Sequence, residues 1–487
     1  MPCAPALRLT SANDAPIRPD GRHVLYWMTA ARRTTHNYAL EHAVARASEL
    51  GKPLVVLEAL RCDYPWASDR LHAFVLAGMR DNAARFARAR IAYHPYVEPT
   101  LGAGKGLLAA LAADACLVVG DEFPCFFLPR MHAAAAARLP VRLELVDGNG
   151  IIPMRANLRT FTTANSFRRH LFKMATPFLG ERPLTDPLAG LDLPPFTLPA
   201  DLLQRWPRAD EALLRGDLAA LARLPIVHTI SPSGHGGSVA ADRQLAALVD
   251  QHIEHYDDDR NSPEKPVTSG LSPHLHFGHI GAHAIFHALA RPHAVRKKPA
   301  KAPEKSDRAA FWGVRPEAEG FIDQLVTWRE LGYNMCFHRP DDYDQYDSLP
   351  SWARNTLAAH AGDPRRPLYT HAQFTAAATH DPLWNAAQRQ LVRDGIIHNY
   401  LRMLWGKKIL EWSPTPQDAL ATMIDLNNRY ALDGRNPNSY SGIFWVLGRY
   451  DRAWGPERPI FGKIRYMSSD NTARKLRVRE YLARHAA

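Results

Sequence analysis

Cysteine is scarce in this chain of 487 residues, and its five copies are scattered. Cys3, Cys62, Cys116, Cys125 and Cys336 form no CxxC pair. This spacing predicts reduced thiols in the core and excludes a disulfide framework. It also argues against a zinc or iron–sulfur centre, so we expect no metal site.

The sequence also lacks an uninterrupted apolar run long enough to cross a bilayer, and we expect no membrane partner. Residues 1–20 show no charged-then-apolar secretion signal, and we expect them to form a loose N-terminal tail. These two absences favour a cytoplasmic protein, and we expect it to be a monomer.

No GxGxxG or P-loop occurs, although residues 21–155 have the alternating pattern of a nucleotide-binding fold. Ala-rich helical stretches separate five expected strands, 23–28, 53–60, 91–97, 116–119 and 141–146. Such alternation predicts an α/β domain with a parallel, Rossmann-like sheet covered by helices on both faces. This domain could be a scaffold without a ligand.

The chain after residue 155 carries few strand signals. Residues 156–240 read as an interdomain linker, with a Pro-rich run at 183–199. Residues 241–487 have almost wholly helical patterns and predict an all-α domain.

Basic residues outnumber acidic ones, and the formal net charge is +11. A basic surface favours a polyanionic partner such as nucleic acid. A general drift of Ala- and Arg-rich proteins toward basic composition explains the charge equally well, so charge alone does not decide between the two.

The most informative stretch is 379–454. Its middle part has apolar residues near a 3.6-residue period from Ile397 to Trp412, which predicts an amphipathic helix. Trp405 and Trp412 are seven residues apart and therefore share a face about 10.5 Å apart along the axis. Arg402 and Lys408 lie within this apolar pattern. Buried charges need partners, and a bound anionic cofactor is one candidate.

Several motifs in this half resemble those of class II cyclobutane pyrimidine dimer photolyases, members of the photolyase/cryptochrome flavoprotein superfamily. They are THDPLWNAAQ from Thr379, LRMLWGKKILEW from Leu401, LDGR followed by PN from Leu432, and RPIFGKIRYM from Arg458. The resemblance covers nearly the whole chain. Several motifs in the same order are far more specific than any one of them.

The resemblance implies an FAD site in the helical domain. Its expected FAD contacts are Tyr256, Thr268, Ser269, Leu271 and Ser272, with Arg329 and Asn334 as pocket neighbours. Alone, the Ser269–Ser272 segment would be read only as a helix start, whose free N–H groups also suit a diphosphate. The N-terminal domain resembles an antenna module, so a second chromophore, a deazaflavin or folate, is a further expectation.

Catalytic roles also follow from the resemblance. Asn427 is expected to face N5 of the flavin, and Arg402 and Asp433 to form an ion pair beside the ring. Trp405, Trp384 and Trp412 match an electron-transfer chain, from inner to outer. Spacing alone favours core packing for these indoles.

The expected lesion pocket and DNA face follow in the same way. Trp328 and Trp445 match walls around a flipped-out dimer, and Met403 matches a further apolar contact. Arg452 and Trp454 are candidates for contacts to the DNA backbone.

The chain departs from the family pattern at Gln324, where the family has a glutamate that contacts the thymines. Glutamine can donate a hydrogen bond but cannot deliver a carboxyl proton. The loop 446–456 also differs in length, and Asn399 stands where class II members usually have glycine.

The resemblance therefore implies light-driven DNA repair by a deoxyribodipyrimidine photo-lyase. Photoexcited reduced FAD would transfer an electron to a cyclobutane dimer in damaged DNA, whose ring then splits. Gln324 keeps two alternatives open: a cryptochrome-like photoreceptor with little repair, and a changed lesion preference such as (6-4) photoproducts. In the (6-4) branch two pocket histidines follow an HxxxH spacing, whereas here Arg402 stands four residues after His398, which disfavours (6-4) repair.

Overall fold

The computed structural model describes residues 4–265, 267–290 and 308–486. The chain divides into two compact units whose ranges interleave. The first contains residues 1–158, 177–246 and 270–288, and the second contains 159–176, 247–269 and 289–487. The region expected to be a linker, 156–240, is therefore shared between the units.

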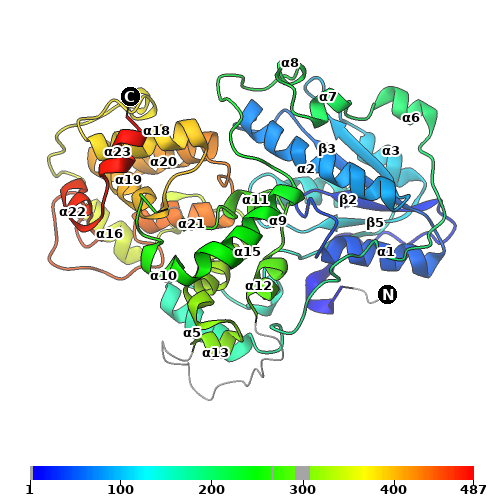
Figure 1. Cartoon of the computed structure of the whole chain (residues 1–487), viewed down its shortest axis with the longest axis horizontal. Coiled ribbons are helices and arrows are strands. Elements are labelled where there is room, and N and C mark those ends of the chain that lie inside the picture. Colours follow the sequence, from blue (N-terminus) through cyan, green and yellow to red (C-terminus); the bar gives the residue numbers. More distant parts are fainter. Residues whose placement is uncertain (1–3, 266, 291–307, 487) are drawn as a thin grey trace. The chain divides into compact units, whose positions relative to one another are not determined.

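The first unit is built on a six-stranded sheet with the order β1-β6-β5-β2-β3-β4 (Figure 1). The strands are β1 (Leu9–Ser11), β2 (His23–Met28), β3 (Leu54–Leu60), β4 (Ala92–Val97), β5 (Ala115–Asp121) and β6 (Leu143–Val146). All neighbouring pairs are parallel except β1 and β6. The five expected strands are present within two residues at each end.

Helices cover both faces of this sheet, as parallel strands require. Val24, Tyr26 and Met28 pack with α1 (Tyr38–Leu50) on one face. Leu25 and Trp27 pack with α3 (Leu107–Ala113) on the other. The alternation along β2 places successive side chains in two different cores. The other helices of the unit are α2 (Asp69–Arg88), α4 (Leu128–Ala136), α6 (Ala200–Arg205), α7 (Glu211–Leu214), α8 (Leu218–Leu221), α9 (Ser238–Ala247), α11 (Ser272–His276) and α12 (Ala282–Leu289).

The N-terminal segment differs from the loose tail that the sequence suggests. β1 pairs with β6 at the edge of the sheet, and Arg8 just before it is fully buried. The Arg8 guanidinium donates to the carbonyl oxygens of Asp147, Gly150 and Ile151. A three-residue strand has too few residues to show a period, so these tertiary contacts had no sequence signal.

The second unit is helical. Its helices are α5 (Ala164–Met174), α10 (Tyr256–Asp259), α13 (Arg308–Trp312), α14 (Glu319–Ile322), α15 (Arg329–His338), α16 (Ser351–Ala359), α17 (His371–Thr375), α18 (Pro382–Asp394), α19 (Asn399–Trp412), α20 (Pro416–Tyr430), α21 (Pro437–Val446), α22 (Ser469–Lys475) and α23 (Arg479–Arg484). A π-helical turn, Asp323–Trp328, joins α14 to α15.

Local signals explain where the central helices begin and end. Asp381 accepts hydrogen bonds from two backbone N–H groups at the start of α18, which begins with Pro382. Gly395 ends this helix in the left-handed conformation, with φ 71°. Asn436 forms a capping box at the start of α21. These caps fix the helices that carry Trp384 and Trp445.

Candidate functional site

The three tryptophans of the expected electron-transfer chain lie together in the core of the helical unit. Trp384, Trp405 and Trp412 are each no more than 3% exposed. Trp384 Nε1 donates to the Trp405 carbonyl over 3.0 Å, and the rings of Trp384 and Trp412 are 6.1 Å apart in an edge-to-face arrangement. The helices α18 and α19 therefore bring into contact residues that are 21 and 28 positions apart in sequence.

Three neighbours of these tryptophans were missed in the sequence. Gln388 Oε1 accepts from Trp405 Nε1 over 2.8 Å. Tyr369 and His380 both contact the Trp412 ring, at 5.6 and 5.0 Å, and Tyr369 Oη lies 2.7 Å from His380 Nδ1. Tyr369 lies in a loop without periodicity, so its neighbours could not be inferred from spacing.

The pairing of Arg402 with Asp433 is present. Arg402 Nη2 lies 3.0 Å from Asp433 Oδ1, and the two side chains are 18% and 14% exposed. Lys408, the other cation in the helix, forms an ion pair with Glu411 at 2.7 Å, so it needs no anionic cofactor as a partner. Removing one member of a largely buried pair leaves an uncompensated charge, which explains why each residue needs the other.

Two observations fit a flavin beside this pair. Arg402 Nε is buried and has no hydrogen-bond partner among the described residues, so it can donate to a ligand. Asn427 is buried on α20, and its amide nitrogen donates to Asn428 Oδ1 over a long 3.4 Å. A weakly held amide can turn toward a heterocyclic nitrogen, because it offers both a donor and an acceptor.

The expected FAD contacts are divided between the two units. Tyr256, Thr268 and Ser269 belong to the helical unit, whereas Leu271 and Ser272 belong to the first unit, where Ser272 begins α11. Burial raises the pKa of Tyr256, and the nearby Arg260 opposes this shift.

Arg329 and Asn334 lie on α15. Arg329 donates to Tyr333 Oη over 3.0 Å. The Asn334 amide accepts from Phe161 N and donates to the Arg159 carbonyl, so it ties the start of the unit to this helix. Its expected place in the pocket stays a prediction.

The two tryptophans of the expected lesion pocket stack on each other. The rings of Trp328 and Trp445 are 4.4 Å apart with an interplanar angle of 27°. Asp451 accepts from Trp445 Nε1 over 3.2 Å and from Trp454 Nε1 over 3.1 Å, which ties the following loop to the stack. The pair therefore forms one continuous aromatic wall, and both indoles remain partly exposed.

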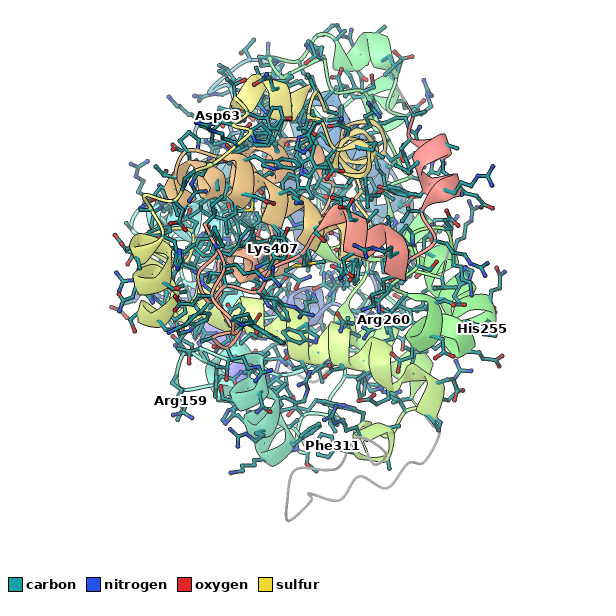
Figure 2. All side chains as sticks on the ribbon, turned by 90° about the vertical axis from the view of Figure 1, so that its left-hand side faces the viewer. Asp63, Arg159, His255, Arg260, Phe311 and Lys407 are labelled. Atoms are coloured by element: carbon teal, nitrogen blue, oxygen red, sulfur yellow. The ribbon has the colours of Figure 1, made fainter. Side chains whose placement is uncertain are left out.

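Gln324 lies at the edge of this wall, on the π-helical turn that also carries Trp328. With its amide oriented to satisfy hydrogen bonds, Oε1 accepts from Trp328 Nε1 over 3.2 Å and from Arg260 Nη1 over 3.0 Å. The amide –NH₂ is then the part of Gln324 that can donate to a base carbonyl. Sequence reasoning identified Gln324 but not Arg260, whose only local signal was an acidic run; Figure 2 labels Arg260 on the helical unit.

Cations flank the wall. Arg168 lies 5.6 Å from the Trp328 ring and pairs with Asp323. In the loop after α21, Arg452 and Arg465 both lie over the Trp454 ring, at 4.4 and 5.1 Å. Arg452 is exposed, and Met403 on α19 is partly buried. Exposed arginine on an aromatic platform suits a nucleic-acid backbone.

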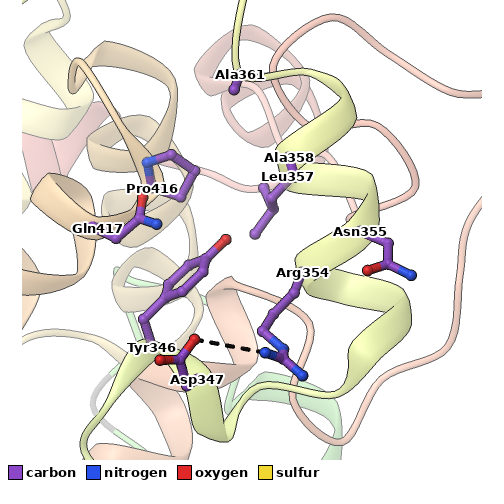
Figure 3. A pocket seen from close by; sticks show the side chains of 9 residues that line it. All are labelled: Tyr346, Asp347, Arg354, Asn355, Leu357, Ala358, Ala361, Pro416 and Gln417. Carbon is purple, nitrogen blue, oxygen red and sulfur yellow. Dashed lines mark ion pairs between the residues drawn. The ribbon is translucent and has the colours of Figure 1, made fainter.

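A separate surface hollow of about 420 Å³ lies between α16 and the start of α20 (Figure 3). Its rim includes Tyr346 and an ion pair of 3.6 Å between Arg354 and Asp347. None of the expected site residues lines it, and the Asp347 side chain is 87% exposed. A cofactor site is usually an enclosed cavity with a few polar groups that point into it, and this open hollow has neither feature.

Within the described ranges, no group of three or more His, Cys, Asp or Glu side chains is arranged to hold a metal ion. In the same part of the chain, no helix combines the length and apolarity that crossing a bilayer requires.

Known proteins resemble the chain over nearly its full length. No protein-family model matches it. A deoxyribodipyrimidine photo-lyase of Methanothermobacter thermautotrophicus is 35% identical over 95% of this chain and 94% of its own. That of Oryza sativa subsp. japonica is 34% identical over 95% of this chain and 87% of its own.

Among solved structures, a bacterial class III photolyase from Agrobacterium tumefaciens superposes with a TM-score of 0.68. It is 18% identical, and the match covers 96% of this chain and 86% of that one, so it supports the fold alone. The sequence identity to the relatives above extends over both units of the molecule. The chain therefore belongs to the deoxyribodipyrimidine photo-lyase family.

Proposed function

We propose that this protein is a light-driven deoxyribodipyrimidine photo-lyase of class II, which splits cyclobutane pyrimidine dimers in damaged DNA. The main support is the aromatic wall of Trp328 and Trp445 with Gln324 at its edge, in the same unit as the buried tryptophans. An extruded dimer presents an apolar cyclobutane ring and carbonyl oxygens, which suit an indole wall and an amide donor.

FAD is the proposed cofactor, and in its reduced form it supplies the light-excited electron that opens the cyclobutane ring. Arg402, held by Asp433, would donate through Nε to the ring system. Asn427 would turn its amide toward N5, and Tyr256, Thr268 and Ser269 of the same unit would hold the remainder of the cofactor. Leu271 and Ser272 stay contacts that only the family resemblance predicts. The protein thus contributes orientation and electrostatics.

Trp405, Trp384 and Trp412 form the proposed route by which an electron enters from the surface. Trp384→Phe removes the middle indole of this route. We therefore expect it to slow light-driven flavin reduction by about tenfold or more, which corresponds to about 1.4 kcal/mol in the barrier. Trp27→Phe, in β2 of the first unit, is the matched control and should leave this rate unchanged. Absorbance during illumination with a thiol reductant measures both. Equal rates in the Trp384 variant and the wild type would contradict the route.

At the lesion, Gln324 and Arg260 are the proposed polar contacts. Gln324 donates through its amide, and the Arg260 guanidinium brings a positive charge to the side where a reduced dimer carries negative charge. Arg452 and Trp454 are proposed to contact the DNA backbone, and the net charge of +11 favours this partner.

Repair of (6-4) photoproducts receives less support. His398 is the histidine in the expected position, and burial lowers its pKa to about 4. It is therefore neutral at pH 7 and a poor source of a proton for that chemistry. We further propose a cytoplasmic monomer, and an antenna chromophore, a deazaflavin or folate, in the first unit.

Illumination of the photoreduced, FAD-loaded protein with dimer-containing single- and double-stranded DNA tests the function. We expect loss of dimers under near-UV or blue light and none in the dark. Gln324→Glu should raise the repair rate, because a carboxyl group can also supply a proton. Gln345→Glu, on an exposed loop, controls for added charge. Absence of repair by both the wild type and Gln324→Glu would contradict photo-lyase activity and favour a photoreceptor.

A further inference from the structure

A buried lysine contacts the residue that follows Trp445 of the aromatic wall. Lys407, labelled in Figure 2, is 1% exposed on α19, one residue after Gly406. Its Nζ donates to the Val446 carbonyl over 2.6 Å. Val446 is the last residue of α21 and follows Trp445 directly. A buried amine is costly unless it performs a definite task, because lysine is almost never fully buried without a partner.

The hydrogen bond completes the C-terminal cap of α21. The last carbonyl groups of a helix lack intrahelical donors and need other partners. The carbonyl of Phe444 accepts from the N–H groups of Leu447 and Arg449, and that of Trp445 accepts from Gly448. The Val446 carbonyl accepts from Lys407. A basic group at this end is also favoured by the helix dipole.

Close packing holds the two helices at the same point. A Cβ atom added to Gly406 would lie 2.5 Å from Val446 Cγ2, so the backbone of α19 is pressed against the end of α21. Asp451 also contacts this turn, by accepting from the indole N–H of Trp445. Lys407 and Asp451 therefore each hold the Trp445 turn by a hydrogen bond.

The electrostatics agree with this arrangement. Burial lowers the pKa of Lys407 to about 7, while the charge of Asp451 opposes the shift and Arg465 adds to it. The amine donates its hydrogen bond in either protonation state. It does not need a salt bridge to do so.

We propose that Lys407 is a positioning residue for the lesion pocket: by capping the Val446 carbonyl, it fixes the last turn of α21 and the plane of the Trp445 indole stacked on Trp328. The inference rests on the proposed function, because it gives Trp445 a task in lesion binding. Lys407 acts through Trp445 and contacts no substrate itself.

A double-mutant cycle tests this inference in the FAD-loaded protein. The measurement is dark binding of a dimer-containing oligonucleotide, relative to the undamaged oligonucleotide. We expect Lys407→Met and Trp445→Phe each to weaken lesion binding roughly tenfold. The double variant should be no weaker than Trp445→Phe alone, because residues acting as a unit are not additive. Lys408→Met, the adjacent lysine, which pairs with Glu411, should bind like the wild type.

A spectroscopic signature separates positioning from general packing. In protein labelled with 5-fluorotryptophan, the Trp445 resonance is identified by its absence in Trp445→Phe. It should shift in Lys407→Met and stay in place in Lys408→Met. Methionine matches the four-carbon stem of lysine in length and lacks only the amine, so the variant should fold. If it loses its flavin, Lys407→Gln is used instead, since its amide is one atom too short to keep the bond, and the same shift is expected.

The outcomes are distinguishable. If Trp445→Phe binds the lesion as tightly as the wild type, Trp445 does not take part in lesion binding. The proposed lesion pocket of Trp328 and Trp445 would then be wrong. Weakened binding by Trp445→Phe together with additive losses, or an unmoved Trp445 resonance in the Lys407 variant, would overturn the role of Lys407 alone.

Discussion

Buried carboxylates of the first unit, called the sheet unit below, and the Arg402 site of the helical unit differ in how their polar groups are satisfied. In the sheet unit, Asp121 accepts from Tyr26 Oη and three successive backbone N–H groups, and Glu58 accepts from Arg32, Asn82 and Tyr93. In the helical unit, Arg402 keeps a buried donor without a partner among the described residues, and Asn427 is weakly held. The two carboxylates therefore serve the architecture of the sheet unit, whereas the spare donor of Arg402, beside an ion pair and a weakly held amide, can serve a ligand.

The units also differ in their histidines. Burial lowers the pKa to about 4 for five buried histidines of the sheet unit, namely His23, His72, His94, His132 and His274. His398 is the corresponding case in the helical unit. The sheet core thus depends on neutral imidazoles more than the helical core does.

Acid is expected to produce the largest difference between the units. Well above pH 6.5, the ordinary pKa of histidine, these side chains are neutral in both the folded and the unfolded state. Between pH 6.5 and about 4 the unfolded chain binds protons that the folded unit does not, so stability falls as pH falls. Each histidine contributes roughly 3 kcal/mol of this loss by pH 4.

Hydrogen exchange at pH 7.5 and 5.0, corrected for intrinsic rates, measures the effect separately in each unit. Protection should fall more in 115–121 than in 399–412. His94→Phe, at a fully buried site, should reduce the fall in the sheet unit. Equal losses in both segments would contradict the comparison.

Breaking a matched ion pair in each unit is expected to have the next largest effect. Arg402→Met should weaken FAD binding about tenfold to a hundredfold, corresponding to roughly 1–3 kcal/mol for a lost charged hydrogen bond. Arg155 pairs with Glu122 at 2.6 Å in the sheet unit, with side chains 25% and 14% exposed. Arg155→Met should lower thermal stability and leave the flavin-to-protein ratio unchanged. An unchanged flavin-to-protein ratio in Arg402→Met would contradict a role of the Arg402–Asp433 pair in FAD binding.

Two glycine-to-alanine substitutions, one in each unit, should change the free energy of unfolding by the smallest amounts. They compare how tightly the chain is packed at Gly332 and at Gly148. A Cβ on Gly332 would lie 2.6 Å from both Pro437 O and Ser441 Oγ, so Gly332→Ala should cost about 1–3 kcal/mol by overpacking α15 against α21. Gly148 has nothing within 4 Å of such an atom, and Gly148→Ala should be neutral or slightly stabilising. Denaturant unfolding followed by tryptophan fluorescence measures both. A neutral Gly332→Ala would contradict the contact.

Much of this organisation could be predicted from the amino-acid sequence. Strand–helix alternation predicted the parallel sheet, because a buried strand and an amphipathic helix have different periods. Periodicity predicted the helix now observed as α19, and the ordered motifs indicated the family. These signals are local, and each is contained within a few turns or one strand.

Other features depended on contacts between distant segments. β1 had too short a pattern to be recognised, and the π-helical turn that joins Gln324 to Trp328 has no period of its own. Arg260 meets Gln324 from 64 positions away, and Lys407 reaches Val446 from 39. Local sequence determined most of the helices and strands and where they are capped, because those choices depend mainly on neighbours along the chain. Only the tertiary structure decided which donor meets which acceptor, because burial removes water as the alternative partner and selects the pairs that satisfy each other.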